Sequence, residues 1–256
     1  MNKCKVCGSD TEFKFEKLVL NKYDVKYYQC NSCMFLQTEK VYWLNEAYSS
    51  AITKQDIGLV YRNLLYAPIV SSIIKLFFNS NKKFLDYGGG YGLFVRIMRD
   101  FGFNFYRFDT YCENIFAEGF DEVDSEKYEL LTSFEVFEHL ENPLQEIDKM
   151  LLKSKSILFS TELQPSNDIE KWWYVMPETG QHISLFSFDS LKFIALKYNL
   201  NLYSNGKTLH LLTDKKINSF LFKLICRSKI AKLVNLLLKN NRSFLMDDYN
   251  KLISSN

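Results

Sequence analysis

The stretch Phe84–Phe94, FLDYGGGYGLF, constrains the fold of the chain more than any other segment. It places four glycines within five positions, directly after a short apolar run. Glycine adopts positive φ angles readily and lets the backbone approach a ligand without a clash from Cβ. The stretch therefore predicts a strand, a tight turn that can lie against a ligand, and a helix.

A regular alternation of strands and helices surrounds this turn. Short apolar runs predict strands at Lys83–Tyr87, Phe103–Phe108, near Val123, Tyr128–Ser133 and Ser156–Ser160. Helical spacing predicts helices at Tyr91–Asp100, Pro143–Leu152 and Phe188–Tyr198, the first with Leu93, Phe94, Ile97 and Met98 facing inward. The stretch Asn199–Thr213 predicts a hairpin that turns on Asn205-Gly206. We expect an α/β fold whose parallel sheet ends in an antiparallel hairpin.

The glycine-rich turn reads Asp86-x-Gly88-x-Gly90-x-Gly92. The dinucleotide-binding fingerprint G-x-G-x-x-G requires a third glycine at the position of Leu93, so that fingerprint is absent. An acidic side chain at the end of the strand repels phosphates but attracts a cation. A cationic ligand therefore suits this turn better than a pyrophosphate.

In these residues the chain resembles the class I S-adenosylmethionine-dependent methyltransferases. The resemblance implies a Rossmann-like seven-stranded sheet that ends in an antiparallel hairpin. It assigns to the first cofactor motif Asp86, Tyr87, Gly88, Gly90 and Gly92. It also implies that Asp109 accepts hydrogen bonds from both ribose hydroxyls, as a carboxylate does well. A glycine-rich turn with a solvated aspartate is the alternative without a cofactor.

The segment YELLTSFEVFEHLENP, residues 128–143, resembles the part of the small-molecule methyltransferases that follows the fourth strand. The resemblance places Phe134 and Glu135 beside the cofactor. It places Glu138 and His139 on the substrate side, as candidate catalytic residues. The start of a helix with a capping acid is the structural alternative for Glu138-His139.

The long segment EKWWYVMPETGQHISLFSFDSL, residues 170–191, resembles a lid found in members that carry an amino-terminal zinc ribbon. Loops of this length in compact domains are often functional. Its aromatic triplet, Trp172 to Tyr174, is suited to stacking on a sugar or a base, although such triplets also pack in cores. We consider His182 both as the catalytic base, ahead of His139, and as a hydrogen-bonded anchor of the loop.

The region between the cysteines and the glycine-rich turn reads as helical, first at Trp43–Ile52 and then at Asp56–Phe78. In the second stretch, apolar residues recur at helical spacing: Ile57, Val60, Tyr61, Leu64 and Leu65. This region also looks like the zinc-ribbon subgroup. The resemblance implies that Tyr48 approaches the site as a catalytic residue and that Arg62 approaches it near the cofactor.

Four of the six cysteines form two pairs, Cys4-x2-Cys7 and Cys30-x2-Cys33. Alternating residues between the pairs predict a β-hairpin that brings the two pairs together. Four thiolates leave no open position on a tetrahedral metal, so we expect structural rather than catalytic Zn²⁺. Redox dithiols are the alternative. Cys112 and Cys226 stand alone and are expected to be ordinary core residues.

The composition excludes some function classes. The chain has 32 basic and 30 acidic residues, a net charge of +2, and a dedicated nucleic-acid-binding protein usually has a larger basic excess. We therefore expect no nucleic acid as partner. No apolar run reaches transmembrane length, and the start MNKCKVCGSD lacks the apolar region of a signal peptide. We expect a cytoplasmic protein.

These patterns divide the chain into four parts: a zinc ribbon at 1–40, a helical connector at 41–80, a methyltransferase core at 81–214 and carboxy-terminal helices at 215–256. The last part contains an apolar helix with interspersed lysines. Such a helix can bind a membrane surface. We favour packing on the body of the protein or against a second copy, which makes these helices the expected homodimer contact.

The predicted function is methyl transfer from S-adenosylmethionine to a small polar metabolite. Relatives with a zinc ribbon often act in sugar or natural-product pathways, which favours O-methylation of a sugar or surface-glycan precursor (capsule or lipopolysaccharide), or of a group attached to it. C-methylation of a nucleotide-linked keto-sugar is the first alternative. Methylation of a ribosomal RNA base is the second, and the near-neutral charge opposes it. A ribbon-based interaction module on an inactive domain is a third, opposed by the intact Asp86 and Asp109.

Overall fold

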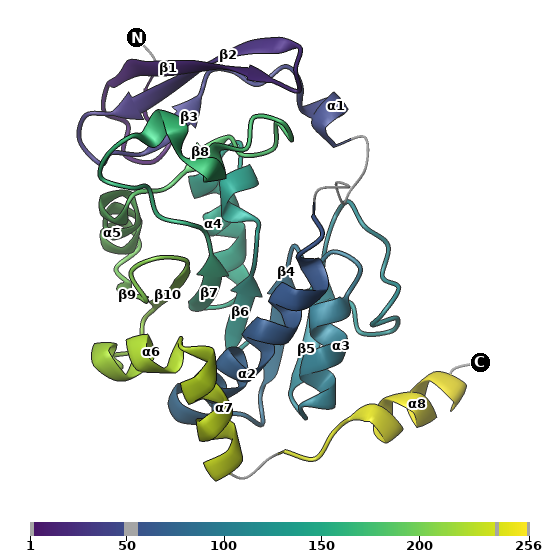
Figure 1. The fold of residues 1–256 in the computed structure, drawn as a ribbon. Coiled ribbons are helices and arrows are strands. Elements are labelled where there is room, and N and C mark those ends of the chain that lie inside the picture. Colours follow the sequence, from purple (N-terminus) through teal and green to yellow (C-terminus); the bar gives the residue numbers. More distant parts are fainter. Residues whose placement is uncertain (1–2, 49–55, 239–240, 255–256) are drawn as a thin grey trace. The chain divides into compact units, whose positions relative to one another are not determined.

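The computed structural model describes residues 3–48, 56–238 and 241–254 of the chain. It divides into two compact units, which we describe separately. The first unit combines residues 1–53, 134–149 and 159–215, and the second combines residues 54–133, 150–158 and 216–256. Figure 1 labels the helices and strands of both units.

The first unit contains an antiparallel sheet in the order β1-β2-β3-β8, with bounds Thr11–Val19, Tyr23–Cys30, Leu36–Thr38 and Ser184–Leu185 (Figure 1). Residues of β2 alternate between core and solvent, as a strand with one buried face requires, and in β1 the alternation is interrupted by a register shift between Phe13 and Phe15. Phe15, Val25 and Tyr27 pack into a core with Trp43 and Ile183. The predicted amino-terminal hairpin is present, and β8 joins its sheet from a distant part of the sequence.

Short helical elements complete this unit. They are α1 (Leu44–Ala47), the 3₁₀ turns η1 (Phe137–His139), η2 (Ile169–Lys171) and η3 (Trp173–Val175), and α5 (Phe188–Lys197). The start of α5 is fixed by a capping box, in which the side chains of Ser187 and Ser190 each accept from the backbone N–H of the other residue. Helix α4 (Pro143–Lys153) begins in the first unit at a proline. The first backbone N–H groups of a helix have no partner within the helix, so a proline at this position loses no hydrogen bond.

The second unit contains the parallel strands β4 (Lys83–Tyr87), β5 (Asn104–Phe108) and β6 (Leu130–Ser133), with β4 paired to both of the others. Helix α2 (Leu59–Phe77) precedes β4, and α3 (Leu93–Asp100) connects β4 to β5. Residues of β4 and β6 are almost entirely buried, as expected for central strands of a covered sheet.

The main sheet has the order β5-β4-β6-β7-β10-β9. Its remaining strands are β7 (Ser156–Ser160), β9 (Asn201–Ser204) and β10 (Leu209–Thr213). Strands β9 and β10 pair antiparallel and turn through Gly206, at φ +84°. The predicted α/β sheet with a terminal hairpin is confirmed. The seven strands that the resemblance implied are six among the described residues, because the short strand expected near Val123 is reduced to one parallel bridge, Arg107↔Asp121, beside β5.

Three carboxy-terminal helices belong to the second unit: α6 (Ser219–Ile225), α7 (Ser228–Leu237) and α8 (Leu245–Ser254). Asn235 of α7 donates to the Pro68 carbonyl of α2 at 2.7 Å and accepts from Ser71 Oγ at 2.6 Å. The carboxylate of Asp248 in α8 pairs with both Nε and Nη2 of Arg99, at 2.7 and 2.6 Å. The helices therefore pack on their own unit. Within the described residues, no helix is long and apolar enough to cross a membrane.

Two helical predictions differ from the structure. The expected helix Trp43–Ile52 is present only as α1, and residues 49–52 lie outside the described residues. Most apolar positions that suggested a core face are exposed: Ile57, just before α2, at 93%, and Val60, Tyr61 and Leu64 in its first turns. Leu65 is half-buried. Burial is concentrated instead in the second half of α2, from Ala67 to Ile74, where the helix packs on α7.

The buried face of α3 is shifted from its predicted position. Phe94 and Met98 are buried as expected, but Val95 and Arg99 complete the face, while Leu93 and Ile97 are only partly buried. A helix pattern cannot show that an arginine lies inside. Arg99 does so because Asp248 neutralises its charge.

Candidate active site

The glycine-rich turn begins directly after β4. Gly88, Gly90 and Gly92 have φ angles of +72°, +53° and +86°, which glycine adopts without strain. Gly89 has a different reason to be glycine, because a Cβ there would lie 2.8 Å from Asp86 Oδ2. At Gly90, by contrast, a Cβ would meet no atom within 4 Å. The backbone at Gly90 is therefore open to a ligand.

Asp86 is a buried carboxylate beside this turn, with only 4% of its surface exposed. It accepts a hydrogen bond from Thr132 Oγ1 at 2.6 Å. Burial raises the pKa of Asp86 to about 7, and the charge of Asp109 adds to this, whereas Thr132 and Arg107 act in the opposite direction. A cationic ligand at this carboxylate would offset the cost of its buried charge.

Asp109 follows β5, the strand next to β4. Its Oδ2 accepts from the backbone N–H of Gly90 at 2.9 Å. Its Oδ1 accepts from the backbone N–H groups of Tyr111 and Cys112 at 2.8 and 2.9 Å. Three main-chain donors thus orient the carboxylate next to the open glycine. Oδ1 already accepts two bonds and Oδ2 accepts one, so the free acceptor site for a ligand hydroxyl is on Oδ2, and a second hydroxyl would compete with a main-chain donor at Oδ1.

Arg62 lies in the first turns of α2. Its Nη2 contacts both carboxylate oxygens of Asp56, at 2.7 and 2.9 Å. This ion pair is partly buried. The sequence assigned Arg62 to the cofactor, and the structure shows it paired with an acidic residue of its own segment.

In the first unit, Phe134 and Glu135 follow β6 directly in sequence. Glu135 has a φ of +55°, which is uncommon for a residue other than glycine and frequent at functional sites. Ser160 holds this conformation, since its hydroxyl accepts from the Glu135 N–H at 2.8 Å and donates to Glu135 Oε1 at 2.7 Å.

The structure brings the predicted catalytic residues of the first unit together. The backbone N–H of Ile183 donates to the Glu138 carbonyl at 2.9 Å, which joins η1 to the segment GQHIS. The rings of His139 and His182 lie 5.0 Å apart at a steep angle. The hydroxyl of Tyr48 lies 3.1 Å from Nδ1 of His139. Residues distant in sequence thus form one cluster.

Glu138 is the buried acid of this cluster. Burial raises its pKa to about 8, with a further contribution from Glu135. Neither carboxylate oxygen has a hydrogen-bond partner of ordinary geometry among the described residues. The hydroxyls of Tyr174 and Thr161 lie close enough to lower this pKa in part. Glu138 therefore keeps its proton up to a higher pH than an ordinary glutamate, and its carboxylate oxygens can still accept hydrogen bonds.

The two histidines are held by main-chain carbonyls. Nδ1 of His182 lies 2.7 Å from the Tyr174 carbonyl, and Nδ1 of His139 lies 3.2 Å from the Gln181 carbonyl. Burial lowers the pKa of His182 to about 4, and that of His139 is lowered as well. Both imidazoles are thus neutral at pH 7. An unperturbed imidazole titrates near neutrality, but these desolvated rings have lowered pKa values and are weaker bases.

The aromatic triplet divides between core and surface. Tyr174 is buried against His182, with ring centroids 4.5 Å apart. Trp173 is 63% exposed, and with Trp172 it lines a hollow of about 590 Å³ that Phe188 and Lys207 also border. Trp173 is available for stacking, whereas Trp172 is partly buried against the core and Tyr174 packs inside it.

The sequence of residues 61–205 matches the family described as a methyltransferase domain. The match covers more than half of the 256 residues. The chain belongs to this methyltransferase family. The expectation of a class I S-adenosylmethionine-dependent methyltransferase is thereby confirmed at the level of family and enzyme class. Among curated proteins, no sequence matches this methyltransferase.

Several solved structures are similar to this chain at low sequence identity. The plantazolicin methyltransferase BpumL in complex with SAH is 13% identical, with 67% of this chain and 93% of that chain covered and a TM-score of 0.47. The mitomycin 7-O-methyltransferase MmcR is 10% identical (68% and 61% covered, TM-score 0.43). An O-methyltransferase family 2 protein from Planctomyces limnophilus, in complex with apigenin, is 14% identical (67% and 65% covered, TM-score 0.43).

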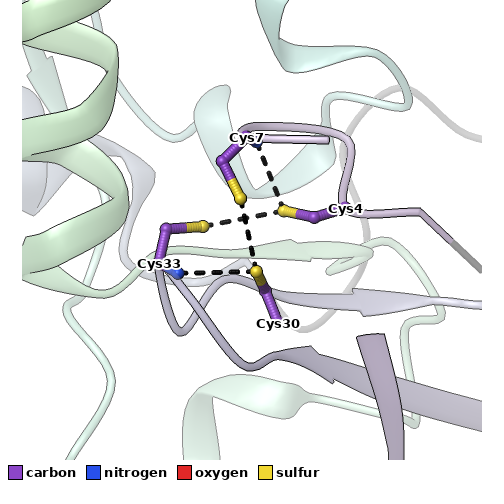
Figure 2. A group of neighbouring side chains, drawn as sticks. All are labelled: Cys4, Cys7, Cys30 and Cys33. Atoms are coloured by element: carbon purple, nitrogen blue, oxygen red, sulfur yellow. Dashed lines mark hydrogen bonds between the residues drawn. The ribbon is translucent and has the colours of Figure 1, made fainter. Parts of the chain in front are cut away.

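The methyltransferase also carries the expected four-cysteine cluster (Figure 2). Sγ of Cys4 lies 3.6 Å from that of Cys33, and Sγ of Cys7 lies 3.3 Å from that of Cys30. A tetrahedral ion with Zn–S bonds of ~2.3 Å requires sulfur–sulfur distances of about 3.8 Å, so the four thiols fit Zn²⁺.

Main-chain N–H groups also form hydrogen bonds to sulfur atoms of this cluster. Backbone N–H groups donate to two of the sulfurs, from Val6 to Cys4 and from Ser32 to Cys30, both at 3.4 Å. Such bonds stabilise thiolate charge. All four cysteines are free thiols rather than disulfides.

Arg107 belongs to the methyltransferase's glycine site as well, although no sequence motif points to it. It is buried at the end of β5, forms an ion pair with Asp121 at 3.0 Å, and donates to the carbonyls of Gly90 and Cys112. Through these carbonyls, Arg107 holds the glycine-rich turn in place. The available signal was the alternation of β5, which gives Arg107 the same face as the buried Phe105.

Proposed function

We propose that this methyltransferase transfers a methyl group from S-adenosylmethionine to an oxygen of a small polar metabolite. The proposed acceptor is a sugar or surface-glycan precursor (capsule or lipopolysaccharide), or a group attached to it. The observation that carries the cofactor assignment is the pair of acids, Asp86 and Asp109, around the open backbone of Gly90.

The residues of the glycine site fit this cofactor chemically. The carboxylate of Asp86 suits the cationic methionine part, and that of Asp109 suits the two ribose hydroxyls. The open space at Gly90 allows the nucleoside to lie on the backbone. When bound, S-adenosylmethionine supplies an electrophilic methyl carbon on a positively charged sulfur. We further assign Tyr87, Gly88, Gly92, Phe134, Glu135 and Arg62 to its surroundings.

Methyl transfer to a hydroxyl requires alignment and the removal of one proton. The acceptor oxygen forms a bond to the methyl carbon while the carbon–sulfur bond breaks, and the hydroxyl proton must leave. We assign proton removal to His182, with His139, Glu138 and Tyr48 orienting the acceptor. The lone pair of His182 Nε2 is available for this role, because Nδ1 donates to the Tyr174 carbonyl.

Several features support a sugar-like acceptor. The exposed Trp173 borders a hollow with Trp172, and aromatic faces stack on sugar rings. The resemblance to zinc-ribbon members that act on sugars and natural products points in the same direction. A structural role of Zn²⁺ in the four-cysteine cluster and a cytoplasmic location belong to this proposal, as does homodimerisation through the carboxy-terminal helices.

A turnover screen tests the proposed function. Purified enzyme is incubated with S-adenosylmethionine and a panel of nucleotide sugars, phosphorylated sugars and structured RNA, and S-adenosylhomocysteine is measured. We expect turnover with a sugar-type acceptor, and NMR of the product should show a methyl ether. A methyl group on carbon would favour the keto-sugar reaction instead. Turnover with RNA alone would refute the small-molecule assignment.

A further inference from the structure

Three side chains of the first unit offer metal-ligand atoms at one point, separately from the four cysteines. One ligand atom each from Glu138, His139 and His182 lies within 4.8 Å of the others. Glu138 and His139 come from η1, and His182 comes from the segment before β8. The hydrogen bond from the Ile183 N–H to the Glu138 carbonyl fixes these two segments together.

Both imidazoles are oriented as metal-binding histidines usually are. A carbonyl oxygen can only accept, so the contact of His182 Nδ1 with the Tyr174 carbonyl places the proton of that ring on Nδ1. His139 Nδ1 contacts both the Gln181 carbonyl and the Tyr48 hydroxyl, and the same arrangement holds there with Nδ1 protonated and the Tyr48 oxygen accepting. The lone pair of each ring is then on Nε2. Metal-ligating histidines characteristically donate their other N–H to a carbonyl or carboxylate.

The carboxylate of Glu138 is also unusual for a core residue. It is fully buried, and no hydrogen bond of ordinary geometry reaches either oxygen within the described part of the chain. Buried carboxylates are normally paired, hydrogen-bonded or bound to a metal. His210 provides a contrast: it is buried too, but its Nδ1 contacts Ser204 Oγ at 2.8 Å and its Nε2 contacts the Thr161 carbonyl at 3.0 Å. His210 is satisfied, whereas the three-residue cluster is not.

We propose that Glu138, His139 and His182 bind a divalent transition-metal ion such as Zn²⁺, through the Nε2 atoms of both histidines and a carboxylate oxygen of Glu138. Two histidines and one glutamate form a known ligand set for zinc, in which a fourth position stays open to water or substrate. The four-cysteine cluster is saturated by its own ligands, so the two sites differ in chemistry.

An ion with an open position would have a consequence for catalysis. With the ion bound, His182 Nε2 is a ligand and no longer a free base, so the ion would replace His182 as the activating group: a hydroxyl bound to it would lose its proton more readily. This consequence rests on the proposed function, whereas the binding of the ion does not. The test therefore counts ions and uses no methyl-transfer assay.

The full chain is dialysed against buffered Zn²⁺, and bound zinc is counted by elemental mass spectrometry. We expect two ions per chain in the wild type and one in Glu138→Gln and in His182→Ala. The matched control His210→Ala removes a buried histidine outside the cluster and should keep two. Titration with Co²⁺ gives a second readout, because the three-residue site should add d–d bands without a thiolate charge-transfer band. We expect Glu138→Gln to weaken this second binding step by about tenfold or more.

A single ion per chain in the wild type would overturn the proposal. So would two ions in both cluster variants, because the second ion would then lie elsewhere. Thermal unfolding of each variant identifies any that fails to fold. If His182→Ala unfolds, the isosteric Glu138→Gln, which removes only the negative charge, decides the result.

Discussion

At the scale of single residues, burial in the fold changes the pKa of Asp86, the carboxylate we assign to the cationic part of the cofactor. Its pKa is raised to about 7 from an ordinary value of 3.8, because burial disfavours the ionised form. The folded chain therefore binds this proton more tightly than the unfolded chain. The contribution of Asp86 to stability is fully present below pH ~4 and is lost as the pH rises through about 7.

The same linkage predicts the pH dependence of cofactor binding. A cationic ligand needs the ionised carboxylate, so affinity for S-adenosylmethionine should fall as the pH drops below about 7. The limiting slope is about tenfold per pH unit for one proton. Calorimetry between pH 5.5 and 8 measures it. Asp86→Asn, which has no proton to lose, should bind weakly at every pH. An affinity of the wild type that is constant across this range would contradict the assignment.

His182 is the residue we assign to proton removal. His182→Ala should lower turnover by about 10²–10⁴ while the affinity for S-adenosylmethionine stays nearly unchanged. Steady-state kinetics at saturating acceptor, together with calorimetry, measure the two effects. His210→Ala is the control, because that histidine is buried and its ring nitrogens contact Ser204 Oγ of the terminal hairpin and the Thr161 carbonyl. Near-normal turnover in His182→Ala would remove His182 from the chemistry.

At the scale of elements, local sequence patterns predicted most of the framework. Strands β4 and β7 begin and end where their apolar runs do, and the hairpin turns at Gly206. Patterns failed where distant residues decide. The first turns of α2 are exposed because the helix packs on α7 only through its second half. Arg99 is buried because it pairs with Asp248. The periodicity of the sequence reveals neither contact.

The amino-terminal cluster is an element whose stability we expect to depend on metal. Cys30→Ser should lose the zinc of this site and destabilise the hairpin β1–β2, since metal binding in such sites is coupled to folding. Elemental analysis and hydrogen exchange at residues 3–38 measure these effects. Cys226→Ser, outside the cluster, is the control. A wild-type protein with no zinc at these cysteines, after purification with zinc present, would refute the structural role.

At the scale of the whole molecule, the sequence predicted the class of reaction better than its acceptor. The acids and glycines of the cofactor motif lie in one short segment and at one strand end, so the resemblance to the methyltransferase family could be carried onto them from the sequence. The cluster of Tyr48, Glu138, His139 and His182 comes from three separate segments, and only the fold shows that they meet. Arg107 and the main-chain supports of both histidines were likewise beyond the reach of a motif.

The central claim is that the turn at Gly90, with Asp86 and Asp109, binds S-adenosylmethionine. Isothermal calorimetry of the wild type and of Asp109→Ala tests it most directly. We expect one site per chain in the wild type and a loss of affinity of about tenfold or more in Asp109→Ala, because each hydrogen bond from a ribose hydroxyl to the carboxylate contributes ~1.5–3 kcal/mol. Asp109→Asn, which keeps one carbonyl acceptor, should lie between them. No binding by the folded wild type, or equal affinity in wild type and Asp109→Ala, would contradict the claim.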